Sequence, residues 1–359
     1  MVKVAIAGGS GQVSKEIIDA LLESKKHQIT ILSRKEAPTA PIAPEIHRKI
    51  VDYNDEKSLV EALRGTHTLL SFVQVLSDPD QKSQKNLINA AIAAGVKRFA
   101  PSEYGSKGTV NMAWWQGKEK VREYLEEVNR KGKILEYTLF QPGLFLNYLA
   151  YPHKTAKYVD PLQSVFDFEN KRAIVIDGHE DAIMTLTTVA DLAAVVARAV
   201  DYEGTWPTTG GIRGNRVTFS QILEVGRKIR GSPFTVDKVK LEDLEAGNLN
   251  TSWGLKAVHK AVSEDQASAL LKAVSIGILL SSSKGAWDIS DDFNQLFPDH
   301  EFTSIEEFLA KVWEGKPWTS CISNGTFYRS LLSSIGVNKV GCWSASFLYS
   351  SYWRRDTHE

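Results

Sequence analysis

The chain has 359 residues, of which 43% are hydrophobic and 24% are charged, enough to bury one large core or two smaller ones. Lys and Arg together number 43, as do Asp and Glu, so there is no basic field for nucleic acid or acidic lipid, and neither partner is expected. No apolar run approaches the roughly 20 residues of a membrane-spanning helix, and the first predicted strand leaves no room for a signal peptide, so a cytoplasmic protein is expected.

Short apolar runs alternate with helix-period segments up to residue 150, which is typical of βαβ units and a parallel sheet. The pattern predicts strands at 2–7, 28–33, 47–51, 67–73, 97–101 and 134–141. Helices are predicted between them at 12–24, 57–64, 80–94 and 114–130. This order predicts an α/β fold with a doubly wound parallel sheet of the Rossmann type.

The alternation loosens after residue 150, where the chain is expected to build a smaller substrate-binding lobe over residues 151–317. The stretch 173–200 predicts a strand, a turn, a second strand and a helix that opens with Thr188 and Asp191 in capping-box spacing. Thr303 and Glu306 predict a second such start for the segment "IEEFLAKVW". Polar helices and loops rich in Gly and Pro are expected between these two helices.

Residues 318–359 form an atypical tail, rich in Ser and aromatic residues, with neither strand alternation nor a capped helix. We expect this tail to be poorly ordered and to lie outside the core. Both cysteines, Cys321 and Cys342, fall in it, and the eight histidines have no ligand spacing. The sequence therefore predicts neither a disulfide framework nor a metal site.

The opening run "KVAIAGGSGQVSKEIIDALLES" places Gly8, Gly11 and Ser14 directly after an apolar strand and at the start of a helix. Gly8 permits the tight turn, Gly11 lets the backbone approach a pyrophosphate, and the third position needs only a small side chain. The N–H groups at the helix N-terminus favour an anion there. The alternative is a Gly-rich turn without a ligand. The predicted cofactor-binding residues of this turn are Gly8, Ser10, Gly11, Gln12 and Val13.

The end of the second predicted strand reads "ILSRKE". An NAD site usually has an acidic residue here for the ribose 2′-hydroxyl, whereas a 2′-phosphate needs cationic donors. Ser33, Arg34 and Lys35 supply one hydroxyl and two positive charges, and Arg34 can bind a phosphate in a bidentate manner. The sequence therefore predicts NADP(H) as the cofactor, with a solvated Arg-Lys loop as the alternative.

Many dehydrogenases of this architecture use a Tyr with a Lys four residues later. Tyr53 and Lys57 have this spacing but follow the third predicted strand, away from the expected site. Tyr104 has Gly108 at that position, and Lys107 stands one residue short. The usual Tyr-Lys proton donor is therefore not present.

The segments "VKRFAPSEYG" and "GKEKVREYLEE" resemble the isoflavone reductase-like, or phenylcoumaran benzylic ether reductase-like, branch of the NmrA-like family of atypical short-chain dehydrogenases. The resemblance extends to "SLVEALRGTHTLLSFV" and "LFPDHEFTSIEEFL" and covers residues 2–313. It implies an NADPH-binding domain over residues 1–150 with a smaller C-terminal substrate lobe. It also implies that Lys118 is the catalytic residue and that Arg34 binds the 2′-phosphate. The departures are Ser14 for the last glycine, Tyr104 where plant members have Phe, and the bulky segment "MAWWQ" before Lys118.

Periodicity alone does not identify Lys118, because Lys118 and Lys120 lie on opposite edges of the apolar stripe of their predicted helix. Without the resemblance, a solvated lysine is the ordinary interpretation. Tyr104 is a candidate second proton donor, with a packed aromatic as the alternative. We expect Pro142 and Gly143 to flank the nicotinamide. The predicted loop contacts to ribose and pyrophosphate come from Phe72, Val73 and Gln74.

Trp114, Trp115 and Tyr148 are consistent with a pocket for a flat apolar or aromatic substrate, and equally with core packing. The sequence thus predicts an NADPH-dependent oxidoreductase that transfers a hydride to a carbonyl or conjugated carbon of a small, secondary-metabolite-like substrate, with Lys118 as general acid. A regulatory protein that senses NADP(H) without catalysis is the alternative. A monomer or homodimer is expected.

Overall fold

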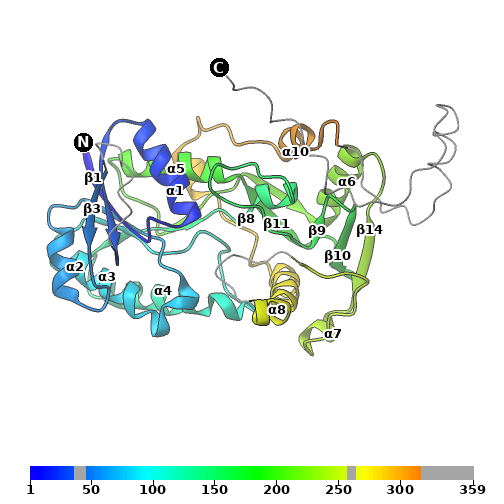
Figure 1. The fold of residues 1–359 in the computed structure, drawn as a ribbon, viewed down its shortest axis with the longest axis horizontal. Coiled ribbons are helices and arrows are strands. Elements are labelled where there is room, and N and C mark those ends of the chain that lie inside the picture. Colours follow the sequence, from blue (N-terminus) through cyan, green and yellow to red (C-terminus); the bar gives the residue numbers. More distant parts are fainter. Residues whose placement is uncertain (36–45, 257–263, 317–359) are drawn as a thin grey trace, which may run out of the picture. The chain divides into compact units, whose positions relative to one another are not determined.

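The computed structural model describes residues 1–35, 46–256 and 264–316 (Figure 1). Residues Met1–Trp318 form one compact unit, and the division predicted at residue 150 stays a prediction. The predicted tail lies outside the described residues. In the part of the chain that the structure describes, no helix combines the length and the apolar character that crossing a membrane requires.

A six-stranded parallel sheet organises the first half of the chain. Its strands, in spatial order, are β3 (Ile46–Ile50), β2 (His27–Ser33), β1 (Val2–Ala7), β4 (Thr68–Ser71), β5 (Arg98–Ala100) and β6 (Glu136–Tyr137). The order runs outward in both directions from the pair β1 and β4, so the topology switches there. A ligand crevice is expected at the carboxyl ends of strands that flank such a switch point.

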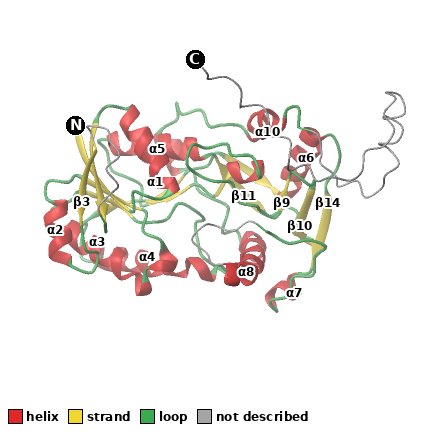
Figure 2. Cartoon of the chain, viewed as in Figure 1, coloured by secondary structure: helices red, strands yellow, loops and turns green. Residues whose placement is uncertain are grey.

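Helices cover both faces of this sheet (Figures 1 and 2). Val4 and Ile6 of β1 point to one face and belong to the same apolar cluster as α1 (Gln12–Glu23) and α5 (Val189–Asp201). Ala5 and Ala7 point to the other face, whose cluster includes α2 (Glu56–Leu63), α3 (Lys82–Ala93) and α4 (Gln116–Asn129). The central strands β1 and β4 are buried on both faces and are mostly apolar, whereas the edge strand β3 is largely exposed. The predicted doubly wound α/β fold is therefore confirmed.

Smaller sheets and helices build the rest of the unit, and most of them pack around a third apolar cluster. Three short sheets, in spatial order, are β14 (Thr235–Val239), β10 (Arg172–Ile176) and β9 (Phe166–Asp167); β13 (Asn215–Thr218), β11 (Ile183–Thr187) and β8 (Leu144–Phe145); and β12 (Thr209–Gly211) and β7 (Leu139–Gln141). The helices here are α6 (Phe219–Arg230), α7 (Leu241–Glu245), α8 (Glu264–Ser283), α9 (Asp292–Leu296) and α10 (Ile305–Trp313). Short 3-10 helices are η1 (Val75–Ser77), η2 (Pro79–Gln81), η3 (Ala113–Trp115) and η4 (Leu146–Ala150).

Two local predictions need correction. The single strand predicted at 134–141 is two strands, because β6 pairs with β5 whereas β7 pairs with β12 in another sheet. The last helix is capped one residue later than predicted, since the Ser304 side chain, and not that of Thr303, accepts the helix N–H, from Glu307. The predicted Thr188 cap is confirmed, because its side chain accepts from the N–H of Asp191.

Candidate active site

The Gly-rich turn joins β1 to α1 in a conformation that depends on glycine at its first position. Gly8 has φ +77°, and a Cβ there would lie 2.8 Å from the backbone carbonyl carbon and oxygen of Phe72, so no other residue fits without displacing that loop. The Gly11 N–H donates to the Gly8 carbonyl at 3.1 Å, and Gly11 is the N-cap of α1 without a side-chain cap. The helix therefore presents uncapped N–H groups next to a close-packed turn, as an anion site requires.

Ser14 stabilises this turn from inside. The residue is buried, and its Oγ lies 3.0 Å from the carbonyl oxygens of both Gly8 and Gly11. The single hydroxyl hydrogen is shared between these two carbonyls. A glycine at position 14 would offer them no such donor. The departure from glycine is therefore accommodated within the protein, where the hydroxyl is bound to the turn itself.

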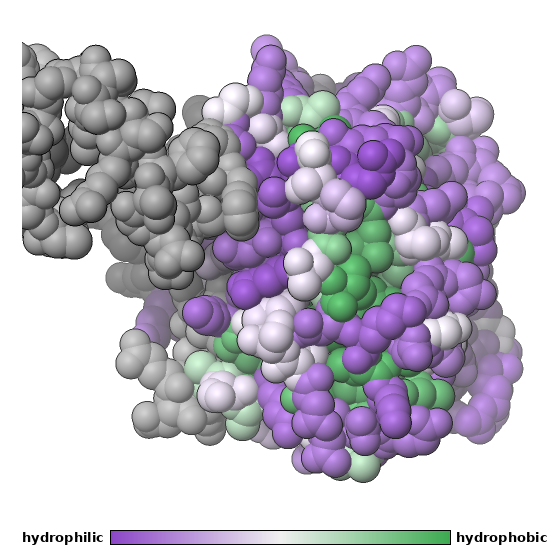
Figure 3. All heavy atoms as spheres, turned by 90° about the vertical axis from the view of Figure 1, so that its right-hand side faces the viewer, coloured by the Kyte–Doolittle hydropathy of each residue, from purple (hydrophilic) through white to green (hydrophobic). Residues whose placement is uncertain are grey.

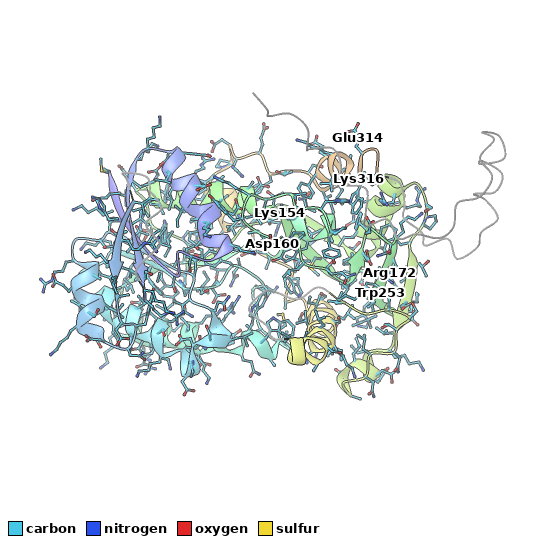
Figure 4. The ribbon with its side chains drawn as sticks, in the orientation of Figure 1. Lys154, Asp160, Arg172, Trp253, Glu314 and Lys316 are labelled. Carbon is cyan, nitrogen blue, oxygen red and sulfur yellow. The ribbon has the colours of Figure 1, made fainter. Side chains whose placement is uncertain are left out.

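The other residues of the turn are divided between surface and core. Ser10 is exposed, and Val13 is half-buried against the cluster that contains α1. The Gln12 side chain is bound within the protein, because its Nε2 donates to Asp160 Oδ2 at 2.8 Å. Asp160 also accepts from Lys154 Nζ at 2.8 Å (Figure 4). A segment 148 residues away thus lies against the start of α1, a contact that no local sequence signal indicates.

The cationic loop after β2 lies near the same turn. The Ser33 Oγ donates to the Lys35 carbonyl at 2.7 Å, while Arg34 and Lys35 are exposed. Burial raises the pKa of Tyr53 to about 12, and the Gly8 N–H and the Arg34 guanidinium both act on that phenol in the opposite direction. Tyr53 therefore lies close to both the Gly-rich turn and Arg34, at the carboxyl edge of the sheet.

The loop after β4 connects the turn to Tyr104. The Phe72 N–H donates to the Ala7 carbonyl at 2.8 Å, and the Phe72 ring stacks on Tyr104 with centroids 4.6 Å apart and planes 7° apart. Val73 is half-buried in the cluster of α2, α3 and α4, and Gln74 is exposed before η1. The backbone of Phe72 and Val73 therefore lies against Gly8 of the turn, while contacts of Phe72, Val73 and Gln74 to ribose and pyrophosphate stay a prediction.

Lys118 is buried on α4, with 4% of its surface exposed. Its Nζ donates to the backbone carbonyl of Glu103 and lies 3.7 Å from the centroid of the Trp115 ring. Burial lowers the pKa of Lys118 to about 8, against the opposing effect of the Glu103 carboxylate. Lys120 on the same helix is exposed and lies 3.5 Å from Asp80 Oδ1. The structure thus separates two lysines that periodicity left equivalent.

Tyr104 has an unusual backbone and an unsatisfied hydroxyl. Its φ is +43°, in the left-handed region, where a non-glycine residue is strained. Its N–H donates to the Phe140 carbonyl at 2.9 Å. Its hydroxyl is buried and has no hydrogen-bond partner among the residues that the structure describes. Burial raises the pKa of this phenol, which therefore stays a neutral donor. A buried donor of this kind calls for a partner from a ligand or water.

Backbone groups of Gly105 and Gly143 lie next to the end of the Lys118 side chain. Gly143 has φ +76°, and its N–H donates to the Gly105 carbonyl at 3.1 Å. Pro142 beside it is buried, and the Lys118 Nζ lies 3.3 Å from where a Cβ of Gly105 would be. The backbone after β7 therefore meets the 103–105 segment at the point where Lys118 ends.

The three aromatic pocket candidates take part in packing. Trp115 covers the Lys118 ammonium and lies 6.0 Å from the Trp287 ring. Trp114 packs against Gly277 of α8, and Tyr148 meets Phe145 edge to face at 5.5 Å. Of the three, only Trp115 contacts a predicted catalytic residue.

Surface grooves lie elsewhere. One of about 360 Å³ lies between α6 and α10 and is lined by Val225, Lys228, Ile229, Glu306, Glu307 and Ala310. Another of about 440 Å³ lies beside α9 and includes Trp206 and Asp292. Figure 3 shows the face that carries α6, β10 and β14, where apolar side chains lie between polar ones. Neither groove contains a predicted site residue, so the buried cluster around Lys118 is the better candidate.

Comparison with known proteins identifies the family of the chain. The model of the NmrA-like family matches residues 2–309. The chain belongs to the NmrA-like family. The family predicted from the "PSEYG" and Lys118 segments is thereby confirmed.

The matches to individual relatives span nearly the whole length of those proteins. "Oxidoreductase swnN" of Metarhizium robertsii is 28% identical over 340 residues, covering 87% of this chain and 98% of that protein. "Phenylcoumaran benzylic ether reductase Betv6" of Betula pendula is 26% identical, and the match covers 86% of this chain and 97% of that protein. The crystal structure of the NADPH-dependent quinone oxidoreductase QOR2 of Escherichia coli complexed with NADPH has a TM-score of 0.61 at 24% identity, covering 86% of this chain and 99% of that one. This structural likeness supports the same fold.

Proposed function

We propose that this protein is an NADPH-dependent oxidoreductase that reduces a carbonyl or conjugated carbon of a small, flat, aromatic or secondary-metabolite substrate, with Lys118 as general acid. The observation that carries the proposal is the buried Lys118 ammonium, whose pKa is lowered to about 8 and which donates to the Glu103 carbonyl. The next residue, Tyr104, stacks on Phe72, whose backbone lies against Gly8 of the Gly-rich turn. Relatives named as oxidoreductases, and an NADPH complex among the similar structures, support this class of reaction.

The residues fit the cofactor. Gly8 leaves no room for a Cβ beside Phe72, and the N-terminus of α1 has N–H groups for a pyrophosphate. The exposed Arg34 and Lys35 would hold a 2′-phosphate. When bound, NADPH supplies the hydride. The backbone of Pro142 and Gly143 would flank the nicotinamide.

Lys118 would supply the proton. An acid works best when its pKa lies near the operating pH, and burial brings this ammonium to about 8. As negative charge develops on the substrate oxygen, the ammonium would stabilise the charge and donate a proton to it. The Glu103 carbonyl accepts a hydrogen bond from Nζ and so fixes the direction of the side chain.

Tyr104 would act as a second donor. Its phenol is neutral, buried and without a partner among the described residues, so a substrate or cofactor oxygen would satisfy it. Stacking on Phe72 holds the ring in one orientation. Because the Tyr104 ring is stacked between Phe72 and Phe140, the preference for a planar substrate rests on Trp115 beside Lys118.

The test compares three variants with the parent protein. Lys118→Ala should lose most turnover, by about 10² to 10⁴-fold, while it binds NADPH almost normally. Lys118→Arg should rescue poorly, because a guanidinium keeps the charge but does not readily release a proton. Lys120→Ala, at an exposed position on the same helix, should be unaffected.

The measurements are NADPH titration and single-turnover reduction across a panel of carbonyl, enone and benzylic ether compounds. Full turnover in Lys118→Ala, or a dead Lys120→Ala variant, would show that the assignment is wrong. Tight NADPH binding without turnover of any compound in a broad panel would instead favour a regulatory protein that senses the cofactor.

A further inference from the structure

A buried ion pair lies directly behind the Lys118 contact. Arg122 Nε lies 2.9 Å from Glu103 Oε1, and its Nη2 lies 2.5 Å from Oε2, so the pair is bidentate. Glu103 is 3% exposed and Arg122 is 9% exposed. The free-energy cost of removing two charges from water offsets much of their attraction. A buried ion pair is therefore weak evidence of a contribution to folding stability.

The same arginine attaches the whole 103–109 segment to α4. Its Nη1 donates to the Lys107 carbonyl at 2.9 Å and to Glu119 Oε1 at 3.0 Å. That Glu119 oxygen also accepts from the Thr109 N–H at 3.1 Å and from its hydroxyl at 2.9 Å. The segment is therefore held along its length by side chains from one face of the helix.

Lys118 and Arg122 are one helical turn apart and contact the same residue at two places. Arg122 binds the carboxylate of Glu103, while Lys118 donates to its backbone carbonyl. The next residue, Tyr104, has φ +43°, and a strained backbone persists only where its surroundings fix it. On the other side, the Phe140 carbonyl holds the Tyr104 N–H.

We propose that Arg122 and Glu103 are positioning residues, whose ion pair fixes the Glu103 carbonyl that orients Lys118 and the strained backbone that presents the Tyr104 phenol. Neither side chain is required to touch substrate or cofactor. The inference rests on the proposed function of Lys118 and deepens it, because one pair would set the geometry of both candidate proton donors.

The charges of the pair can be separated from its geometry. The Glu103 carboxylate raises the pKa of Lys118, the Arg122 guanidinium lowers it, and the Glu119 carboxylate raises it. Removing Glu103 and Arg122 together therefore leaves the net charge beside Lys118 unchanged, while it removes the contact that fixes the segment. If the pair acts only through its charges, the double variant should recover the reaction rate of the parent. If the pair positions the segment, the rate should stay low.

The experiment compares Glu103→Gln, Arg122→Met and the double variant with the parent, using single-turnover rates, their pH profiles and NADPH titration. We expect Arg122→Met to lower kcat at least tenfold with little change in cofactor affinity or KM. We expect the double variant to regain the pH inflection of the parent but not its rate. Arg122→Lys should rescue poorly, because an ammonium cannot form the bidentate contact. Arg130→Met, at the exposed end of the same helix, is the matched control.

Amide hydrogen exchange of residues 103–109 adds a readout that needs no substrate. Exchange should become faster in Arg122→Met and in the double variant, and should stay as in the parent in Arg130→Met. The positioning role would be overturned if Arg122→Met kept both the amide exchange and the single-turnover rate of the parent. It would also be overturned if the double variant reduced substrate at the rate of the parent. Lys118→Ala, assayed in parallel, separates the two claims. If it keeps full activity, the proposed function fails; if it is dead while Arg122→Met is active, only the positioning role fails.

Discussion

Replacing Lys118 with methionine should make the protein more stable. The side chain is 4% exposed, and burial lowers the pKa of its ammonium from 10.5 to about 8. A lysine whose pKa is lower in the folded state destabilises the fold wherever it is ionised, because the unfolded chain binds the proton more tightly. Methionine keeps an unbranched side chain of similar length and removes the charge.

The lowering from 10.5 to about 8 corresponds to about 3 kcal/mol at roughly 1.4 kcal/mol per pH unit. The variant also loses the hydrogen bond to the Glu103 carbonyl, which contributes about 1 kcal/mol, so a net gain of about 2 kcal/mol is expected at pH 7. With an unfolding entropy of roughly 2.1 cal/mol/K per residue over Met1–Trp318, this raises Tm by about 3 °C.

The pH dependence distinguishes this account from a general packing effect. The cost of the ammonium is complete below pH 8 and fades as the pH rises from about 8 toward 10.5, so the advantage of Lys118→Met should shrink over that interval. Scanning calorimetry at pH 7 and pH 9.5 measures the difference in stability between Lys118→Met and the parent, with Lys120→Met at an exposed position as control. A variant less stable than the parent, or a difference independent of pH, would refute the reasoning.

Other predictions concern the cofactor site. Arg34→Ala should erode the preference for NADPH over NADH by about 1 to 3 kcal/mol, as measured by titration calorimetry, and equal affinities in the parent would contradict the role of Arg34. Ser14→Gly should leave NADPH affinity within a few-fold but lower the free energy of unfolding by about 1 to 2 kcal/mol, since it removes the hydroxyl shared by Gly8 and Gly11. Gly11→Val should abolish binding, and retained binding there would place the phosphates elsewhere.

Local patterns predicted the sheet well because its central strands are buried on both faces. The apolar run of Val2–Ala7 and the Gly-rich turn after it specify a strand and a tight turn without reference to distant residues. The strand predicted at 134–141 was wrong in extent because its second half pairs with Thr209–Gly211, far along the chain. The start of α10 was ambiguous for another reason. Both Thr303 and Ser304 have a glutamate three residues later, so either matches the capping pattern.

Tertiary contacts decided these ambiguous positions. The Thr303 backbone is bound outside the helix, because its N–H donates to Asp191 Oδ2 at 3.2 Å and its carbonyl accepts from Asn215 Nδ2 at 2.9 Å. Lys118 was ambiguous in the same way, since both it and Lys120 lie at an edge of the apolar stripe. The 103–109 segment and the Trp115 ring lie against Lys118, and these contacts bury it while Lys120 stays exposed.

Two of the departures from the family pattern, Ser14 and Tyr104, add a hydroxyl group, and the two hydroxyls differ in what they bind. Ser14 adds a hydroxyl whose hydrogen is used by the Gly8 and Gly11 carbonyls, so it contributes to the structure of the turn and leaves no donor for a ligand. Tyr104 adds a hydroxyl that is equally buried and has no partner among the described residues. An unsatisfied buried donor costs about 1 to 3 kcal/mol, and the strained backbone at φ +43° adds to that cost. A residue used only for packing would be as well served by phenylalanine, so Tyr104, and not Ser14, is the departure expected to change which substrate the site accepts.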